Sequence, residues 1–326
     1  MKLAVALLAA ASSAGAFTPG SNGVRSSTQL NARQPILLAS FNLISDGWEL
    51  EGGFLPSFLD CGRRKLTFEN ANCLFHFVFK MNPATEADAL NLANGFVALL
   101  NEMADTCAMD DVEGCTEVVL FPPYPFISKV KDIVSKEGIT VGSQQIFYED
   151  KGAFTGSVSA SMVKSIGCEY VLCGHSERRT LFSDSDSNIN AKVKKVLEFG
   201  MKPILCIGET QQEYDLDITQ EVCAMQVSKD LKGVSKEEMQ NVVIAYEPVW
   251  AIGTGLVCDA DAAHHSVLAK MYGDEVAQAT RIQYGGSVTP DSVDGLLAKS
   301  DIDGCLVGGA SLFSDKFARI CNFKAE

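Results

Sequence analysis

Eight short, almost continuously apolar runs are spaced along the chain, with longer amphipathic segments between them. Such runs are typical of parallel strands covered on both faces, because neither face of the strand meets water. Regular alternation of these strands with helices predicts an α/β protein with a single (β/α)₈ barrel. The runs lie at Ile36–Phe41, Glu117–Phe121, Thr140–Ser143, Tyr170–Cys173, Pro203–Ile207, Val242–Tyr246, Arg281–Tyr284 and Cys305–Val307.

The segments between the runs are long enough for helices that pack on a barrel. A doubly wound sheet is the alternative architecture, but no Gly-x-Gly-x-x-Gly turn follows the first run, and this disfavours it. The predicted helices lie at Glu86–Ala104, Phe126–Lys136, Ala160–Ile166, Asn188–Glu198, Thr219–Leu231, Ala260–Met271 and Pro290–Leu297.

The first 33 residues have the composition of a targeting sequence. Residues 1–16 combine Lys2, an apolar stretch and small residues at the end, which predicts a signal peptide. Residues 17–33 are rich in Ser and Thr and contain Arg but no acidic residue, as in a transit peptide. This order is similar to the bipartite plastid presequence of algae. We expect a barrel of residues 34–326 in the plastid (chloroplast) stroma, with the secretory pathway or the cytoplasm as the alternative.

Charge and cysteine usage narrow the classes of function. The chain has 27 Lys and Arg against 41 Asp and Glu, a net charge of −14, which disfavours nucleic-acid binding. No apolar run beyond the N-terminus is long enough for a membrane span, so no membrane association is expected in the mature form. The 11 cysteines form no Cys-x-x-Cys pair, which favours a reducing compartment and indicates no metal site. Cys173, Cys206 and Cys305 lie in apolar runs and should be buried.

Polar or small residues follow the apolar runs, always at the same end. In a barrel the carboxyl ends of the strands form the active site, so packing alone does not explain this pattern. These positions are Asn42, Gln144–Gln145, Gly174–Arg179, Gly208–Glu209, Glu247–Pro248, Gly285–Ser287 and Gly308–Gly309.

Six longer motifs carry a family resemblance. They are Lys80-Met-Asn82, Gly152-Ala-Phe-Thr-Gly156, Gly174-His-Ser-Glu-Arg-Arg179, Ala245-Tyr-Glu-Pro-Val-Trp-Ala-Ile-Gly-Thr-Gly255, Tyr284-Gly-Gly-Ser-Val288 and Asp303-Gly-Cys-Leu-Val-Gly-Gly-Ala-Ser-Leu312. In these motifs and in their order the chain resembles triosephosphate isomerase. The resemblance runs from Gln34 to the C-terminus, except for one stretch.

The resemblance implies an isomerase that interconverts dihydroxyacetone phosphate and D-glyceraldehyde 3-phosphate through an enediolate, without a metal or organic cofactor. In that family, the residue matching Glu247 shuttles the proton, and this enzyme is a well-known example of that chemistry. The neutral imidazole of His175 would donate to the substrate oxygens, and Lys80 would supply positive charge. Glu177 would orient Lys80, with a surface ion pair to Arg178 as the alternative. Taken alone, a strand-end Glu or His is more often a structural residue.

Two loops would hold the phosphate, and a third would close over it. Ser287, Gly308 and Gly309 follow the last two runs, where barrel enzymes commonly bind phosphate. The segment after Glu247 resembles the family's lid, and its Gly253 would also contact phosphate. The remaining lid residues are Val249, Trp250, Ala251, Ile252, Thr254 and Gly255.

The loop of residues 143–156 resembles the one that inserts into a neighbouring subunit, with Thr155 near the partner's site. The resemblance therefore implies a homodimer. Two positions depart from the family pattern. Gln145 stands where Asn is usual, and Leu256–Cys258 at the far end of the lid lacks the expected Lys.

Residues 43–79 do not fit the resemblance, because the family's first strand runs directly into Asn-Trp-Lys-Met-Asn. In the favoured alignment Ile36–Phe41 is that strand, Asn42 is the catalytic asparagine, and residues 43–79 are an insertion, hypothetically a retained intron. In the second alignment Leu74–Phe79 is the first strand, Val78 occupies the asparagine position, and an oxygen-binding amide is lost.

Two other functions remain as alternatives. One is a catalytically impaired phosphate-binding barrel, spoiled by the insertion. The other is a different phosphosugar barrel enzyme, such as an epimerase, which would share the phosphate loops. Such an enzyme has no reason to carry both the Gly-His-Ser-Glu-Arg-Arg and the Tyr-Glu-Pro-Val-Trp motifs.

Overall fold

The structure is a computed structural model that describes residues 41–44, 47–50, 75–106, 116–254 and 263–324. The chain divides into two units, Met1–Gln34 and Pro35–Glu326, and every described residue belongs to the second. No helix in the described part of the chain is long and apolar enough to cross a membrane.

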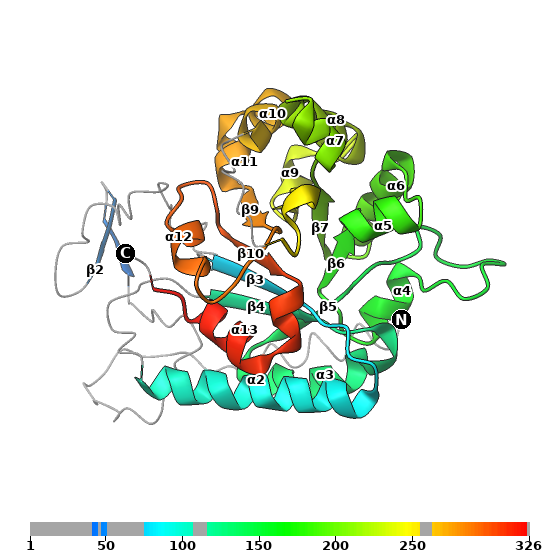
Figure 1. Cartoon of the computed structure of the whole chain (residues 1–326). Coiled ribbons are helices and arrows are strands. Elements are labelled where there is room, and N and C mark those ends of the chain that lie inside the picture. The colour runs from blue at the N-terminus through cyan, green and yellow to red at the C-terminus, as the bar shows by residue number, and fades with distance from the viewer. Residues whose placement is uncertain (1–40, 45–46, 51–74, 107–115, 255–262, 325–326) are drawn as a thin grey trace, which may run out of the picture. The chain divides into compact units, whose positions relative to one another are not determined.

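A closed barrel of eight parallel strands forms the centre of this unit (Figure 1). The strand order around the barrel is β10-β3-β4-β5-β6-β7-β8-β9, so consecutive strands are neighbours and the last pairs with the first. This confirms the predicted (β/α)₈ fold. The strands are β3 (Phe75–Lys80), β4 (Thr116–Phe121), β5 (Thr140–Ser143), β6 (Tyr170–Cys173), β7 (Lys202–Ile207), β8 (Val243–Tyr246), β9 (Arg281–Tyr284) and β10 (Gly304–Val307).

The first barrel strand is not the one that the favoured alignment placed there. Phe75–Lys80 pairs with β4 on one side and with β10 on the other. The prediction that Ile36–Phe41 is strand one is therefore wrong, and residues 75–79 belong to the barrel rather than to an insertion. Phe41 and Asn42 lie in β1 (Phe41–Ile44), which pairs only with β2 (Gly47–Leu50) in a separate antiparallel sheet. Residues 51–74 lie outside the described part of the chain.

Helices connect the strands and cover the barrel (Figure 1). Several begin with Ser or Thr side chains that accept a backbone N–H, such as Ser159, Ser185, Thr210 and Ser235. The helices are α2 (Glu86–Thr106), α3 (Ile127–Val134), α4 (Ala160–Ser165), α5 (Ser176–Leu181), α6 (Asp186–Glu198), α7 (Gln211–Asp215), α8 (Thr219–Asp230), α9 (Lys236–Met239), α10 (Ala263–Tyr272), α11 (Asp274–Ala279), α12 (Val293–Leu297) and α13 (Ser314–Cys321).

Alternation along each strand divides the core into two layers. One buried cluster gathers alternate residues from the strands, including Val78, Tyr170 and Leu306, and fills the barrel interior. The larger cluster lies between the strands and the helices. There Phe79 packs on Phe317 of α13, with ring centroids 4.0 Å apart, and on Phe96 of α2 at 5.8 Å. Because Val78 faces the interior, Lys80 two residues later also faces the interior, at the end of the strand.

The cysteines of the apolar runs behave as small buried side chains, as predicted. Cys173, Cys206 and Cys305 are buried and unpaired. Burial raises the pKa of the Cys173 thiol to about 12. These groups are therefore uncharged thiols at neutral pH, which suits an apolar barrel.

Candidate active site

Four of the predicted catalytic side chains lie together at the carboxyl ends of three strands. Lys80 ends β3, Glu247 directly follows β8, and His175 and Glu177 follow β6 at the start of α5. His175 Nε2 lies 2.9 Å from Glu247 Oε1, and Lys80 Nζ lies 3.1 Å from the same nitrogen. Residues that are up to 167 positions apart in sequence thus meet within hydrogen-bonding distance, as the barrel topology requires.

The two oxygens of the buried Glu247 carboxylate have different surroundings. Oε2 accepts a hydrogen bond from the backbone N–H of Ser176 at 2.9 Å. Oε1 receives no backbone N–H from the described residues and faces only the imidazole Nε2 of His175, at 2.9 Å. A side chain can move aside for a ligand more easily than the backbone can, so Oε1 is better suited than Oε2 to accept a proton.

Glu247 is charged at neutral pH. Burial alone would raise its pKa. The contacts with His175, the Ser176 N–H and the charge of Lys80 outweigh burial, and the pKa lies below its ordinary value of 4.5. A base must be ionised before it can take a proton, and this environment keeps it so.

The first turn of α5 fixes the form of the His175 ring. The backbone N–H of Glu177 points at His175 Nδ1 from 3.2 Å, and an N–H can only donate. Nδ1 therefore carries no proton, and the neutral ring carries its proton on Nε2. That places an N–H donor on the side of the ring that faces Glu247 and Lys80.

Lys80 is held by Glu177 and by the strand that carries it. Its ammonium group donates to Glu177 Oε1 at 2.8 Å, and its backbone oxygen accepts from Ser311 Oγ at 2.7 Å. The side chain is only 17% exposed. This agrees with the expectation that Glu177 orients Lys80.

Glycines give Glu247 the room it needs. A Cβ on Gly208 would lie 1.9 Å from the backbone oxygen of Glu247, and a Cβ on Gly285 would lie 2.8 Å from Glu247 Cγ. Both distances are shorter than real side chains allow. The small residues at the ends of β7 and β9 are therefore part of the site.

The lid segment is tied to two neighbouring loops. Ser287 Oγ donates to the backbone oxygen of Ala251 at 2.7 Å, and Trp250 Nε1 donates to Glu209 Oε1 at 2.7 Å. The ring of Trp250 also stacks on that of Tyr214, with centroids 4.0 Å apart. Sequence reasoning placed Glu209 at a strand end but gave it no role. Its position after Gly208 was the only signal.

The remaining predicted lid and phosphate residues lie in the loops that follow strands β8 and β10. Val249–Ala251 forms a short 3₁₀ turn, followed by Ile252, Gly253 and Thr254. Gly308 and Gly309 follow β10, and a Cβ on either would meet open space. Gly255 and Leu256–Cys258 lie outside the described residues.

Asn42 is not part of this cluster, which corrects the prediction. It pairs with Glu49 in the separate two-stranded sheet. Val78 of β3 stands two residues before Lys80 and faces the barrel interior, among apolar side chains. The second alignment had assigned this position to Val78. The barrel interior thus has a hydrocarbon side chain at this position instead of an amide, as the second alignment predicts.

The loop after β5 has an exposed apolar tip. The ring of Phe147 contacts those of Tyr148 and Phe154, and Phe154 is 40% exposed next to the exposed Thr155. In the described part of the chain no group of three or more His, Cys, Asp or Glu side chains could hold a metal ion.

Comparisons with known proteins identify the family. The family model for triosephosphate isomerase matches residues 78–324. The chain is 44% identical to the triosephosphate isomerase of Alkaliphilus metalliredigens, over 69% of this chain and 91% of that protein. It is 45% identical to that of Carboxydothermus hydrogenoformans, over 70% of this chain and 91% of that protein. It is 42% identical to that of Chloroflexus aurantiacus, over 74% of this chain and 94% of that protein. The chain belongs to the triosephosphate isomerase family.

Proposed function

We propose that Glu247, His175 and Lys80 carry out the isomerisation of dihydroxyacetone phosphate and D-glyceraldehyde 3-phosphate that the family membership assigns to this chain. The observation that carries the proposal is the charged, buried carboxylate of Glu247, whose Oε1 atom lies 2.9 Å from the imidazole Nε2 of His175. Substrate enters between these two groups and separates them.

The proton moves in two steps. Glu247 Oε1 takes a proton from carbon 1 of dihydroxyacetone phosphate, and the electron pair of that C–H bond forms the enediolate. Negative charge then builds up on the substrate oxygens, where His175 Nε2–H donates and Lys80 supplies positive charge. A proton also moves from the oxygen on carbon 1 to the oxygen on carbon 2, through Nε2 of His175, which gives its proton to one oxygen and takes one from the other. Glu247 then returns its proton to carbon 2, and carbon 1 becomes the aldehyde. Charge is balanced throughout, and no electrons leave the substrate.

Ser287, Gly308 and Gly309 bind the phosphate, and the segment from Val249 to Gly255, with Gly253, closes over it. The support for this assignment is that Ser287 and the glycine pair follow the adjacent strands β9 and β10. Backbone N–H groups at glycines approach phosphate oxygens closely, and a lid excludes water.

The test is turnover of dihydroxyacetone phosphate by the chain from Gln34 onward, compared with Glu247→Gln. Loss of the base lowers kcat by about 10²- to 10⁴-fold. Glu169→Gln is the matched control, because Glu169 directly precedes β6 at the opposite end of the barrel and is exposed. Binding of an enediolate-like inhibitor without any turnover would instead support the impaired barrel.

The active form is a homodimer joined through residues 143–156, with Thr155 near the partner's site. The exposed ring of Phe154 and its neighbours supports this, because an exposed apolar tip is stabilised by insertion into a partner. Sedimentation velocity checks the assembly, and a monomer at micromolar concentration with full turnover would contradict it.

The protein works in the plastid stroma, where the reaction serves carbon fixation as well as glycolysis and gluconeogenesis. The support is the composition of residues 1–16 and 17–33 and the absence of acidic residues before Asp46. A fluorescent protein carrying residues 1–33 tests this in an alga with secondary plastids. Fluorescence in the secretory pathway or the cytoplasm would contradict it.

A further inference from the structure

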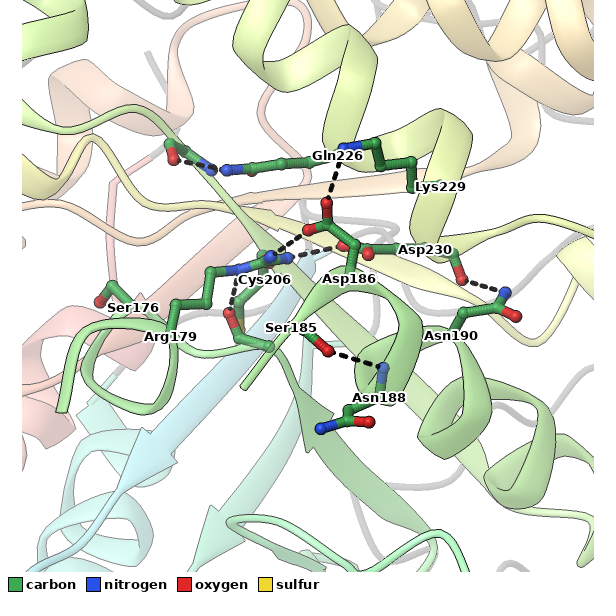
Figure 2. A network of polar contacts seen from close by, with 12 residues as sticks. Ser176, Arg179, Ser185, Asp186, Asn188, Asn190, Cys206, Gln226, Lys229 and Asp230 are labelled. Atoms are coloured by element: carbon green, nitrogen blue, oxygen red, sulfur yellow. Dashed lines mark hydrogen bonds and ion pairs between the residues drawn. The ribbon is translucent and has the colours of Figure 1, made fainter. Parts of the chain in front are cut away.

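The guanidinium group of Arg179, in α5, holds two strand ends of the active site together (Figure 2). Nε donates to the backbone oxygen of Gly174 at 2.8 Å, and Nη2 donates to that of Cys206 at 3.0 Å. Gly174 directly precedes His175, and Cys206 lies in β7, two residues before Gly208. One rigid, planar group therefore fixes the peptide that leads into the imidazole relative to the neighbouring strand.

Two carboxylates fix the guanidinium group in turn. Arg179 Nη1 donates to Asp186 Oδ1 at 2.9 Å, and Nη2 donates to Asp230 Oδ2 at 2.6 Å. Asp186 begins α6 and Asp230 ends α8, so Arg179 is bound from two different helices. Four bonds to acceptors in separate elements leave the side chain a single orientation.

A second side chain of α8 binds the same mouth of the barrel. Gln226 lies one turn before Asp230, and its amide pairs with Gly208 in both directions. Oε1 accepts from Gly208 N at 2.8 Å, and Nε2 donates to Gly208 O at 3.1 Å. Gln226 and Asp230 are both buried. Helix α8 thus holds the end of β7 directly through Gln226, and the ends of β6 and β7 indirectly through Arg179.

Stability does not explain why Asp230 is buried with a charge. Its side chain has no solvent exposure, and its Oδ1 atom has no hydrogen-bond partner among the described residues. A buried ion pair is often no more stabilising than apolar side chains of the same volume. Here the pair fixes a guanidinium group that also holds the backbone oxygen of Gly174, directly before His175.

We propose that Arg179, fixed by Asp230 and Asp186, is a positioning residue for the isomerase reaction that holds His175 in register with Glu247. This rests on the proposed role of His175. Arg179 does not touch substrate and acts only through the Gly174 peptide.

The central test is Arg179→Lys. Lysine keeps the charge and can pair with one carboxylate, but its single nitrogen cannot bind both backbone oxygens and both carboxylates in a fixed plane. We expect kcat to fall about 10- to 100-fold, since small misplacements of a catalytic group cost that much. KM should stay within about 3-fold, because the described contacts of this network do not include the phosphate loops.

Two further variants test whether the charge of the network, rather than its shape, determines kcat. Asp230→Asn keeps the size and an acceptor oxygen but loses the charge, and should lower kcat about 3- to 10-fold. Lys195→Ala is the matched control. It removes an ion pair with Glu198 within α6 that lies outside the Arg179 network, and should leave kcat within about 2-fold.

The imidazole NMR signals of His175 report on position directly. They should shift in Arg179→Lys and Asp230→Asn but not in Lys195→Ala, with the other three histidines of the chain as internal references. If the folded fraction of Arg179→Lys had wild-type kcat and an unshifted His175, the network would be purely structural and the inference wrong. If Arg179→Lys did not fold, Asp230→Asn would give the same two readouts.

Failure of this inference is distinct from failure of the proposed function. A wild-type chain that does not convert dihydroxyacetone phosphate would overturn the catalytic assignment itself. An active wild-type chain whose kcat is insensitive to both substitutions would overturn only the positioning role.

Discussion

At the scale of single residues, the reactivity of Glu247 depends on how its two oxygens are held. Among the described residues Oε1 meets the imidazole Nε2 of His175, at 2.9 Å, and Gly208 and Gly285 leave room for the side chain. The carboxylate is therefore fixed through Oε2 by the Ser176 N–H, whereas Oε1 depends on the side chain of His175. The position of the Glu247 carboxylate therefore depends on the space that its neighbours leave for it.

Gly285→Ala should disturb that space. The new Cβ would lie 2.8 Å from Glu247 Cγ, so the carboxylate must shift by several tenths of an ångström. We expect kcat to fall about 10-fold or more while the protein stays folded. Gly295→Ala in α12 is the control, because a Cβ there meets nothing within 4 Å. Steady-state kinetics of both variants check this, and equal kcat values would contradict it.

Val78→Asn should restore a polar group to the barrel interior. An amide at this position, two residues before Lys80, can donate to the substrate oxygens, and we expect kcat/KM to rise about 3- to 10-fold. The gain is limited because the neighbouring side chains in the cluster are apolar. Val78→Leu has nearly the shape of Asn without its amide and should give no gain. A rise in both variants, or in neither, would argue against an oxygen-binding position here.

At the scale of elements, the strands predicted from apolar runs were confirmed where the run is followed directly by polar or small residues of the barrel mouth. Thr140–Ser143, Tyr170–Cys173 and Arg281–Tyr284 have the predicted bounds. Here burial on both faces and the polar residue after the strand point to the same answer. The short helix α7 was not predicted, because its five residues give no apolar periodicity.

The first strand could not be chosen from hydrophobicity, because Ile36–Phe41 and Phe75–Phe79 are both apolar. The connection to Lys80 separates them physically. Lys80 must stand at the carboxyl end of a strand to meet His175, and only a strand that runs continuously into it does so. In the same way, no pattern in the sequence indicated that the Ser176 N–H would bind Glu247, since that contact depends on β6 and β8 being brought together by the barrel.

Phe79→Ala tests the assignment of β3. Its ring packs between α2 and α13, and truncation of a buried Phe costs about 3–5 kcal/mol of unfolding free energy. Phe41→Ala is the comparison, since the other alignment would place that residue in the barrel. Urea denaturation of both variants distinguishes the two alignments. A large loss for Phe41→Ala with none for Phe79→Ala would reverse the assignment of strand one.

At the scale of the whole molecule, stability and function place opposite demands on the network of Figure 2. The pKa of Asp230 is raised to about 6, mainly by burial and also by the nearby charge of Asp186, although Arg179 and Lys229 act in the opposite direction. The folded protein therefore binds this proton more tightly than the unfolded chain, where an aspartate has a pKa near 3.9. Protonation stabilises the fold but removes the charge that holds Arg179.

The sign of the resulting pH dependence is specific. Because the folded-state pKa is raised, the contribution of Asp230 to unfolding free energy should increase as pH falls from 7 through about 6 toward 4, by on the order of 1–3 kcal/mol. Asp230→Asn cannot take up this proton and should lack that part of the slope. Urea denaturation of both proteins at pH 7 and pH 5 measures the difference, and identical slopes would show that Asp230 titrates normally. The charge on Asp230 lowers stability and also orients Arg179. If the wild-type protein gains stability at pH 5 and its His175 signals move, the same proton is linked to both the stability of the fold and the position of His175.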